Sequence, residues 1–103
     1  MKTNDLSGAA LDWAVAQCEG TLHEDGSVSD YFQPSADWEQ GGAIIEQEGI
    51  SLDYDGLGTW VATIITNGSV FEESGGTPLE AAMRCYVESE LGDYVAVPAD
   101  LYK

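Results

Sequence analysis

The chain has 103 residues, enough for one domain with a single core, and 44% of them are hydrophobic, including three Trp and five Tyr, as in a folded protein. Three basic residues against 19 acidic ones give a formal net charge of −16, which argues against binding to nucleic acid or to an anionic membrane. A basic protein surface is the natural complement, although acidity can also serve solubility alone.

The first predicted helix covers Ser7 to Glu19, with Ser7 as its cap and Gly20 at its end. The stretch after it, up to Pro34, is the least patterned part of the chain. It contains the only histidine, His23, which has no second metal ligand or nucleophile near it in sequence and is interpreted as solvated.

Two adjacent glycines mark the next segment. Inside a helix each would cost about 1 kcal/mol relative to alanine, so a helix is predicted from about Gly42 to Glu48 and ended by Gly49. The glycines are explained either by the close approach of another helix or by a ligand pocket roofed by Trp38. One helical face would carry Trp38, Gly41, Gly42 and Ile45.

Three strands are predicted at Ile50–Asp55, Thr59–Thr66 and Ser69–Glu73. Asn67-Gly68 is a strong signal for a two-residue type I′ turn, so the strands should form an antiparallel meander. The tail from Tyr94 to Pro98 is expected to be extended and to pack on the body of the domain.

The clearest helix runs from about Pro78 to Leu91. Thr77 is placed to cap it, Glu80 completes a capping box, and Gly92 would supply a left-handed end. Its apolar stripe consists of Leu79, Ala82, Met83, Tyr86, Val87 and Leu91, of which Met83 and Tyr86 should be buried against the sheet.

The order is therefore helix, short helix, three strands and helix. It predicts a single two-layer α+β domain over residues 1–103, in which a three-stranded antiparallel meander has helices packed on one face. Cys18 and Cys85 fall within predicted helices without a metal or redox spacing and should be buried, reduced thiols. No apolar run approaches the length of a membrane helix and the N-terminus lacks a signal core, so a cytoplasmic location is predicted.

Arg84 is the only cation away from the chain ends, where Lys2 and Lys103 lie. It stands four residues from Glu80 and from Glu88, so it either forms solvated pairs with them or anchors an anion or a partner carboxylate. The candidate ligand- or partner-binding residues are Trp38, Gly41, Gly42, Glu46 and Arg84. No catalytic constellation, metal set or cofactor motif is predicted, and an enzyme is not favoured.

Three segments carry a family resemblance: Leu6 to Gly20, Pro34 to Ile50, and Thr77 to Val87 followed by Leu91-Gly92-Asp93 and Val97-Pro98. Together they resemble the phage NinX-like family of small phage and prophage proteins. The resemblance implies expression inside an infected bacterium, hence in the host cytoplasm, and carries no established molecular function with it.

Three hypotheses follow. The first is a non-catalytic binder that inhibits a host protein, such as a defence factor, through the acidic surface. The second is a pocket protein that sequesters a small, anionic, nucleotide-like signal near Trp38, Gly41, Gly42 and Arg84. The third and least favoured is a small hydrolase that uses glutamates. Self-association into a homo-oligomer is left open.

Overall fold

The computed structural model describes residues 1–101, and Lys103, the basic residue at the chain end, lies outside this range. Three α-helices and a three-stranded sheet follow one another in the predicted order. In chain order the elements are η1 (Thr3–Asp5), α1 (Gly8–Glu19), α2 (Trp38–Glu48), β1 (Ser51–Tyr54), β2 (Trp60–Thr66), β3 (Ser69–Gly75), α3 (Pro78–Leu91) and η2 (Ala99–Leu101).

The sheet is the predicted antiparallel meander, with strand order β1-β2-β3. Thr66 pairs with Ser69 across a two-residue turn in which Asn67 and Gly68 both have positive φ, as a type I′ turn requires. The side chains of Ala62 and Ile64 on β2 are buried, whereas Ile65 between them and the turn is 73% exposed. One face of the sheet is therefore covered and the other faces solvent.

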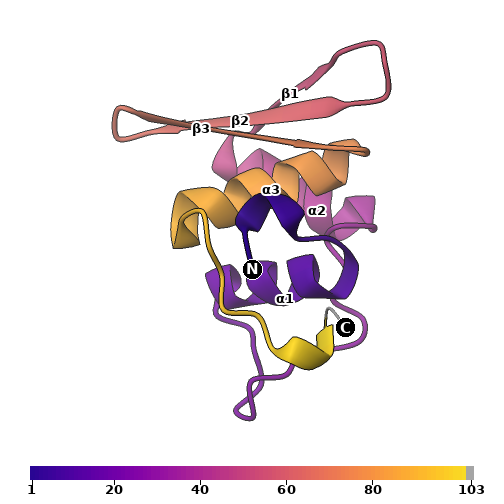
Figure 1. The fold of residues 1–103 in the computed structure, drawn as a ribbon, viewed down its shortest axis with the longest axis vertical. Helices are drawn as coiled ribbons and strands as arrows, with labels where there is room; N and C mark the ends of the chain where they lie inside the picture. The colour runs from indigo at the N-terminus through magenta and orange to yellow at the C-terminus, as the bar shows by residue number, and fades with distance from the viewer. Residues whose placement is uncertain (102–103) are drawn as a thin grey trace.

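Helix α3 is the centre of the domain. It packs directly against β2 and β3, while α1 and α2 pack against α3, so α1 lies on the far side of α3 from the sheet (Figure 1). The α+β architecture is confirmed, with α3 as the helix that lies on the sheet. This position explains why α3 is buried on both sides, at Ala81, Ala82, Met83, Cys85, Tyr86 and Val87.

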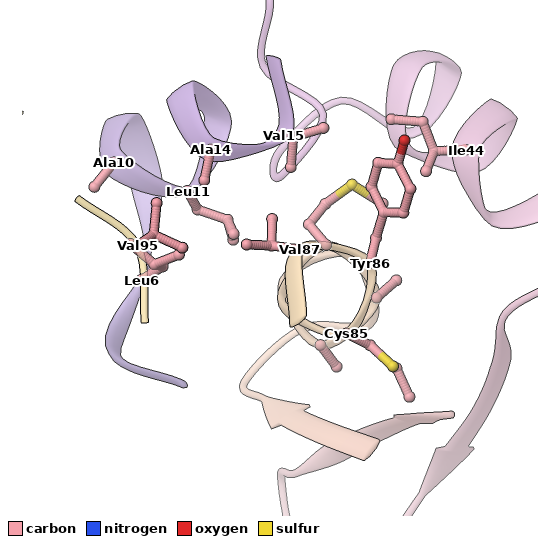
Figure 2. Packing of buried hydrophobic residues seen from close by; sticks show 14 of the residues in the cluster. Leu6, Ala10, Leu11, Ala14, Val15, Ile44, Cys85, Tyr86, Val87 and Val95 are labelled. Carbon is pink, nitrogen blue, oxygen red and sulfur yellow. The ribbon is translucent and has the colours of Figure 1, made fainter. Parts of the chain in front are cut away.

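The prediction that Tyr86 packs against the sheet is wrong. Figure 2 looks along α3 and shows Cys85 pointing to the strands, whereas Tyr86 and Val87 point toward α2 and α1. The Tyr86 hydroxyl donates a hydrogen bond to Glu19 at the end of α1, 2.5 Å away. The apolar stripe was identified correctly, but it faces the other helices because α3 has a second buried side made of smaller residues.

Helix ends differ from the predictions at three places. Helix α2 begins at Trp38 instead of Gly42, because the Asp37 side chain accepts a hydrogen bond from the N–H of Glu39 and caps it there. Ser7 makes no side-chain cap for α1. Gly92 has φ 88° and ψ −165°, so it is an extended positive-φ residue and not a left-handed helical cap.

The extended tail closes the domain by pairing with the N-terminus. Val95 donates its N–H to the carbonyl oxygen of Met1 at 2.8 Å, and the Met1 ammonium donates back to the Val95 carbonyl at 2.8 Å. Val95 and Val97 are buried in the core, as the packing of this tail on the body requires. The tail then ends at η2, beside the N-terminal half of α1.

Candidate functional site

The Gly41-Gly42 pair lies inside α2, and its two members have different surroundings. A Cβ on Gly41 would clash with the carbonyl oxygen of Pro34 and would lie 2.6 Å from Cδ2 of Leu79 on α3. The close neighbour that the sequence required at Gly41 is therefore the chain itself. Gly42 has no comparable contact, since the atom nearest to its Cβ position is Cε3 of Trp38 at 3.8 Å.

Trp38, Gly42 and Glu46 share the outer face of α2 because they follow one another at four-residue steps. Trp38 is 56% exposed and Glu46 is exposed as well. Gly41, on the side of the helix that faces α3, is buried. The structure thus groups three of the five predicted site residues on one surface and places Gly41 in the interior.

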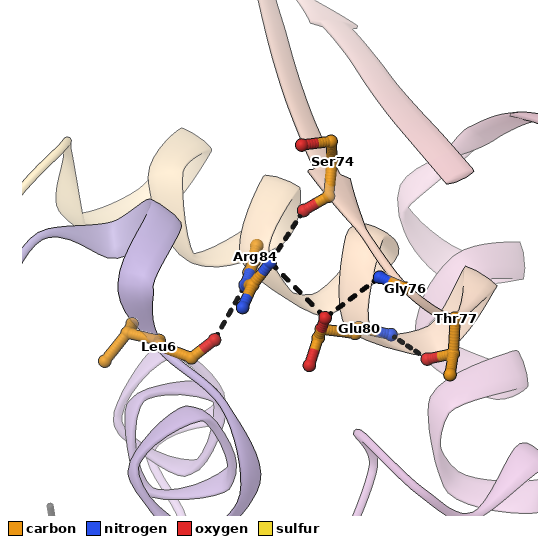
Figure 3. A network of polar contacts seen from close by, with 6 residues as sticks. All are labelled: Leu6, Ser74, Gly76, Thr77, Glu80 and Arg84. Carbon is orange, nitrogen blue, oxygen red and sulfur yellow. Dashed lines mark hydrogen bonds and ion pairs between the residues drawn. The ribbon is translucent and has the colours of Figure 1, made fainter. Parts of the chain in front are cut away.

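Arg84 ties three parts of the chain together (Figure 3). Its Nε donates to the carbonyl oxygen of Leu6 at 2.7 Å, and its Nη1 donates to that of Ser74, at the end of β3, at 2.8 Å. Nη1 also lies 3.4 Å from Oε1 of Glu80, and the Arg84 side chain is only 14% exposed. Arg84 is therefore a structural cross-link between the segment before α1, the sheet and α3.

Glu80 connects this cross-link to the start of α3. Its Oε1 accepts a hydrogen bond from the N–H of Gly76 at 3.0 Å, while its own N–H donates to the Thr77 hydroxyl at 3.1 Å. The predicted capping arrangement is present, shifted by one residue, because the carboxylate reaches Gly76 instead of the cap residue.

None of the five predicted site residues lines either of the two hollows described next.

The larger hollow, here called the Asp12 hollow, has a volume of about 570 Å³ and lies between α1, the 25–36 segment and η2. This volume is within the range of ligand pockets. Its apolar lining includes Trp13, Val28, Phe32, Pro98 and Leu101. Its acidic lining consists of Asp12, Asp25, Asp30 and Asp100.

Among residues 1–101, Asp12 is the only buried acidic residue, with 6% of its surface exposed. One of its oxygens accepts a hydrogen bond from the N–H of Ser35 at 2.9 Å, which fixes the last part of the loop before α2. Burial raises the pKa of Asp12, and the hydrogen bonds from Ser35 act in the opposite direction. No lysine or arginine from residues 1–101 lines this hollow.

Trp13 and Asp25 belong to the lining of the Asp12 hollow and are held by hydrogen bonds to its loop. The Trp13 indole N–H donates to the carbonyl oxygen of Gly26 at 2.9 Å, so the ring is held against the loop. The Asp25 carboxylate accepts hydrogen bonds from the N–H and hydroxyl of Ser27, which lower the pKa of Asp25 and keep it ionised. Sequence reasoning missed this hollow because the 21–34 segment has no hydrophobic periodicity. The signal that could have revealed it is Asp12, an aspartate that stands beside Trp13 within a buried helical stripe.

A second hollow of about 290 Å³ lies where the N-terminus meets the C-terminal tail, and its lining includes a carboxyl pair. The pKa of Glu73 is raised to about 7, first by burial and then by the hydrogen bond with Glu88 and its charge. The same hollow is lined by Lys2, Asn4, Asp93 and Tyr94.

The chemistry available elsewhere is limited. Both cysteines are free; Cys85 is buried as predicted, whereas Cys18 is only half-buried. Desolvation raises the pKa of each thiol to about 12, so neither is a reactive thiolate at neutral pH. Across residues 1–101 there is no group of three or more His, Cys, Asp and Glu side chains that could hold a metal ion. Over that same span, no helix is both long enough and apolar enough to cross a membrane.

The fold and these hollows define a small, acidic α+β protein built around one central helix. Residues 2–90 match the family model described as "Bacteriophage P22, NinX". Because the match covers most of the chain, the protein belongs to this phage family, and the resemblance seen in the sequence is confirmed. No curated protein matches the chain.

Proposed function

We propose that this phage protein acts by non-catalytic binding in the cytoplasm of the infected bacterium, where its acidic surface engages and inhibits a host protein with a basic surface. The observation that carries the proposal is an acidic surface whose carboxylates form almost no ion pairs with cations of the same chain. Of the 19 acidic residues, only Asp12 is fully buried, and residues 1–101 form a single ion pair, Arg84 with Glu80.

Within residues 1–101, the few cations do not neutralise the acidic surface. The Arg84 guanidinium is directed onto two backbone carbonyls, and the Met1 ammonium donates to Val95. Lys2 is exposed but lies beside Glu73, Glu88 and Asp93. Such a surface attracts basic partners over distances of about 10 Å at 0.1 M salt and repels acidic ones.

The nucleotide-sequestering alternative receives less support from this geometry. A phosphate group needs a cation or free backbone N–H groups, and Arg84 already uses Nε and Nη1 within the fold. The Asp12 hollow would place carboxylates against such a ligand. For the hydrolase alternative, the Glu73–Glu88 pair resembles an acid–base pair, so turnover of a substrate that is lost in Glu73→Gln would favour it over the binding proposal.

Affinity capture from a lysate of host cells tests the proposal. The bait is the full chain, and the control bait carries four exposed outer carboxylates changed to amides, at Glu39, Glu46, Glu72 and Glu90. The proposal predicts one stoichiometric host protein of basic isoelectric point that is eluted by salt and captured less by the control bait. Capture of an acidic protein that resists salt, or recovery of a nucleotide with the bait, would contradict it.

A further inference from the structure

We infer that the Asp12 hollow receives an arginine or lysine side chain of the partner protein, carried next to an apolar residue. The inference rests on the proposed function and names the place where the basic partner is recognised. It is argued from the charge of the hollow, from its apolar lining, and from the fixed positions of its walls.

Within residues 1–101, all charged side chains that line the hollow are negative. Asp12 is 94% buried, yet its partner in the fold is a neutral backbone N–H from Ser35, and no cation from residues 1–101 lines the cavity. A buried carboxylate without a counter-charge is costly, and a cation brought into the cavity would remove that cost. Asp30 and Asp100, both exposed, add negative charge to the same lining.

The lining also selects the kind of cation. A guanidinium or ammonium group next to Asp12 would be accompanied by its aliphatic stem, which can pack on Trp13 and Phe32. Aromatic rings also attract cations that lie over their faces. A metal ion would leave the surfaces of Val28, Pro98 and Leu101 in contact with water, whereas an apolar residue beside the arginine or lysine covers them.

The walls of the hollow are already held in place. Trp13 is fixed by its hydrogen bond to Gly26, and the 33–36 segment is fixed to α1 through Ser35 and Asp12. A partner side chain would therefore enter a preformed cavity and would not have to order the loop first, which favours binding.

The test uses the full chain and three probes. The first is the blocked tripeptide acetyl-leucyl-arginyl-phenylalanyl-amide, the second is the same peptide with neutral citrulline in place of arginine, and the third is spermidine. Binding is followed at low salt by NMR, at the Trp13 indole N–H and the Ser35 backbone N–H, both of which report on the hollow. We expect the arginine peptide to shift these two signals and the citrulline peptide to bind about tenfold more weakly or worse.

Two substitutions with the same charge change locate the site. Asp12→Asn keeps an oxygen for the Ser35 N–H but loses the charge, and it should weaken the arginine peptide by about tenfold or more. Asp53→Asn, on exposed β1 away from the hollow, should leave the affinity unchanged. If Asp12→Asn does not fold, the exposed pair Asp30→Asn and Asp100→Asn replaces it, with the same expected direction.

Several outcomes would overturn the inference. Equal affinities for the arginine and citrulline peptides would show that the hollow does not recognise the positive charge. Equal losses of affinity in Asp12→Asn and Asp53→Asn would show the same. Spermidine binding as tightly as the peptide would identify a small cation instead of a protein side chain. If Asp12→Asn captures a basic host protein as well as the unchanged chain does, this inference fails while the proposed function stands. If the arginine peptide binds but no basic host protein is captured, the proposed function fails.

Discussion

Replacing Gly41 with alanine should destabilise the fold, although the same change usually stabilises a helix. The added methyl group would clash with the backbone carbonyl oxygen of Pro34 and meet Cδ2 of Leu79 at 2.6 Å. The Leu79 side chain could rotate, but Pro34 is fixed beside α2 and would have to move with its loop. Overpacking of this kind costs about 1–3 kcal/mol, against a helix-propensity gain of about 1 kcal/mol.

Gly42→Ala is the matched control, because it makes the same chemical change one residue later in α2. Its Cβ would meet only Trp38 Cε3, at an ordinary 3.8 Å, so the propensity gain of up to about 1 kcal/mol should remain. Since both variants share that gain, the difference between their unfolding free energies isolates the clash and should be about 1–3 kcal/mol. Urea unfolding measures this difference. Equal stability of the two variants would refute the packing explanation of Gly41.

Three further predictions concern α3 and its contacts. Arg84→Ala should lower the free energy of urea unfolding by about 2 kcal/mol or more, because two backbone carbonyls lose charged donors. Arg84→Lys should recover only part of this loss. A loss within about 0.5 kcal/mol for Arg84→Ala would mean that the cross-link does not stabilise the fold. Glu73 has a folded pKa of about 7 against an ordinary value of 4.5, so its contribution to stability is present below pH 4.5 and is lost as the pH rises through 7. Thermal unfolding should therefore give a lower melting temperature at pH 8 than at pH 5, and Glu73→Gln should reduce this difference. If the difference is the same in Glu73→Gln, other groups cause it. Met83→Ala should cost about 2–5 kcal/mol by cavity formation in urea unfolding, since Met83 is fully buried, and a much smaller loss would mean that the core collapses around the site.

Local sequence signals were sufficient for most of the fold. The Asn67-Gly68 turn has a backbone requirement that few residues meet, and it placed the β2–β3 hairpin correctly. The Thr77 cap and Pro78 placed the start of α3 for a similar reason. The start of α2 was misplaced because the intrinsic cost of glycine was given more weight than the Asp37 cap and the tight packing that only glycine permits at position 41.

Features that depend on tertiary contacts were beyond the sequence. The i,i+4 spacing predicted the ion pair of Arg84 with Glu80, but the other partners of Arg84 are carbonyl oxygens from residues 6 and 74, which no spacing rule connects to it. The direction of Tyr86 could not be predicted because α3 is buried on two sides and periodicity cannot say which neighbour meets which side. The Asp12 hollow likewise forms from an unpatterned loop, a helix and the C-terminal tail, which only the folded chain brings together.

The central claim is that this protein binds a basic partner through its acidic surface. The most direct measurement is the dissociation constant for the captured host protein as a function of sodium chloride concentration, since screening shortens the range of surface charges from about 10 Å at 0.1 M to 3 Å at 1 M. The account predicts that the dissociation constant rises steeply and continuously with salt. A dissociation constant that is independent of salt over this range would contradict it.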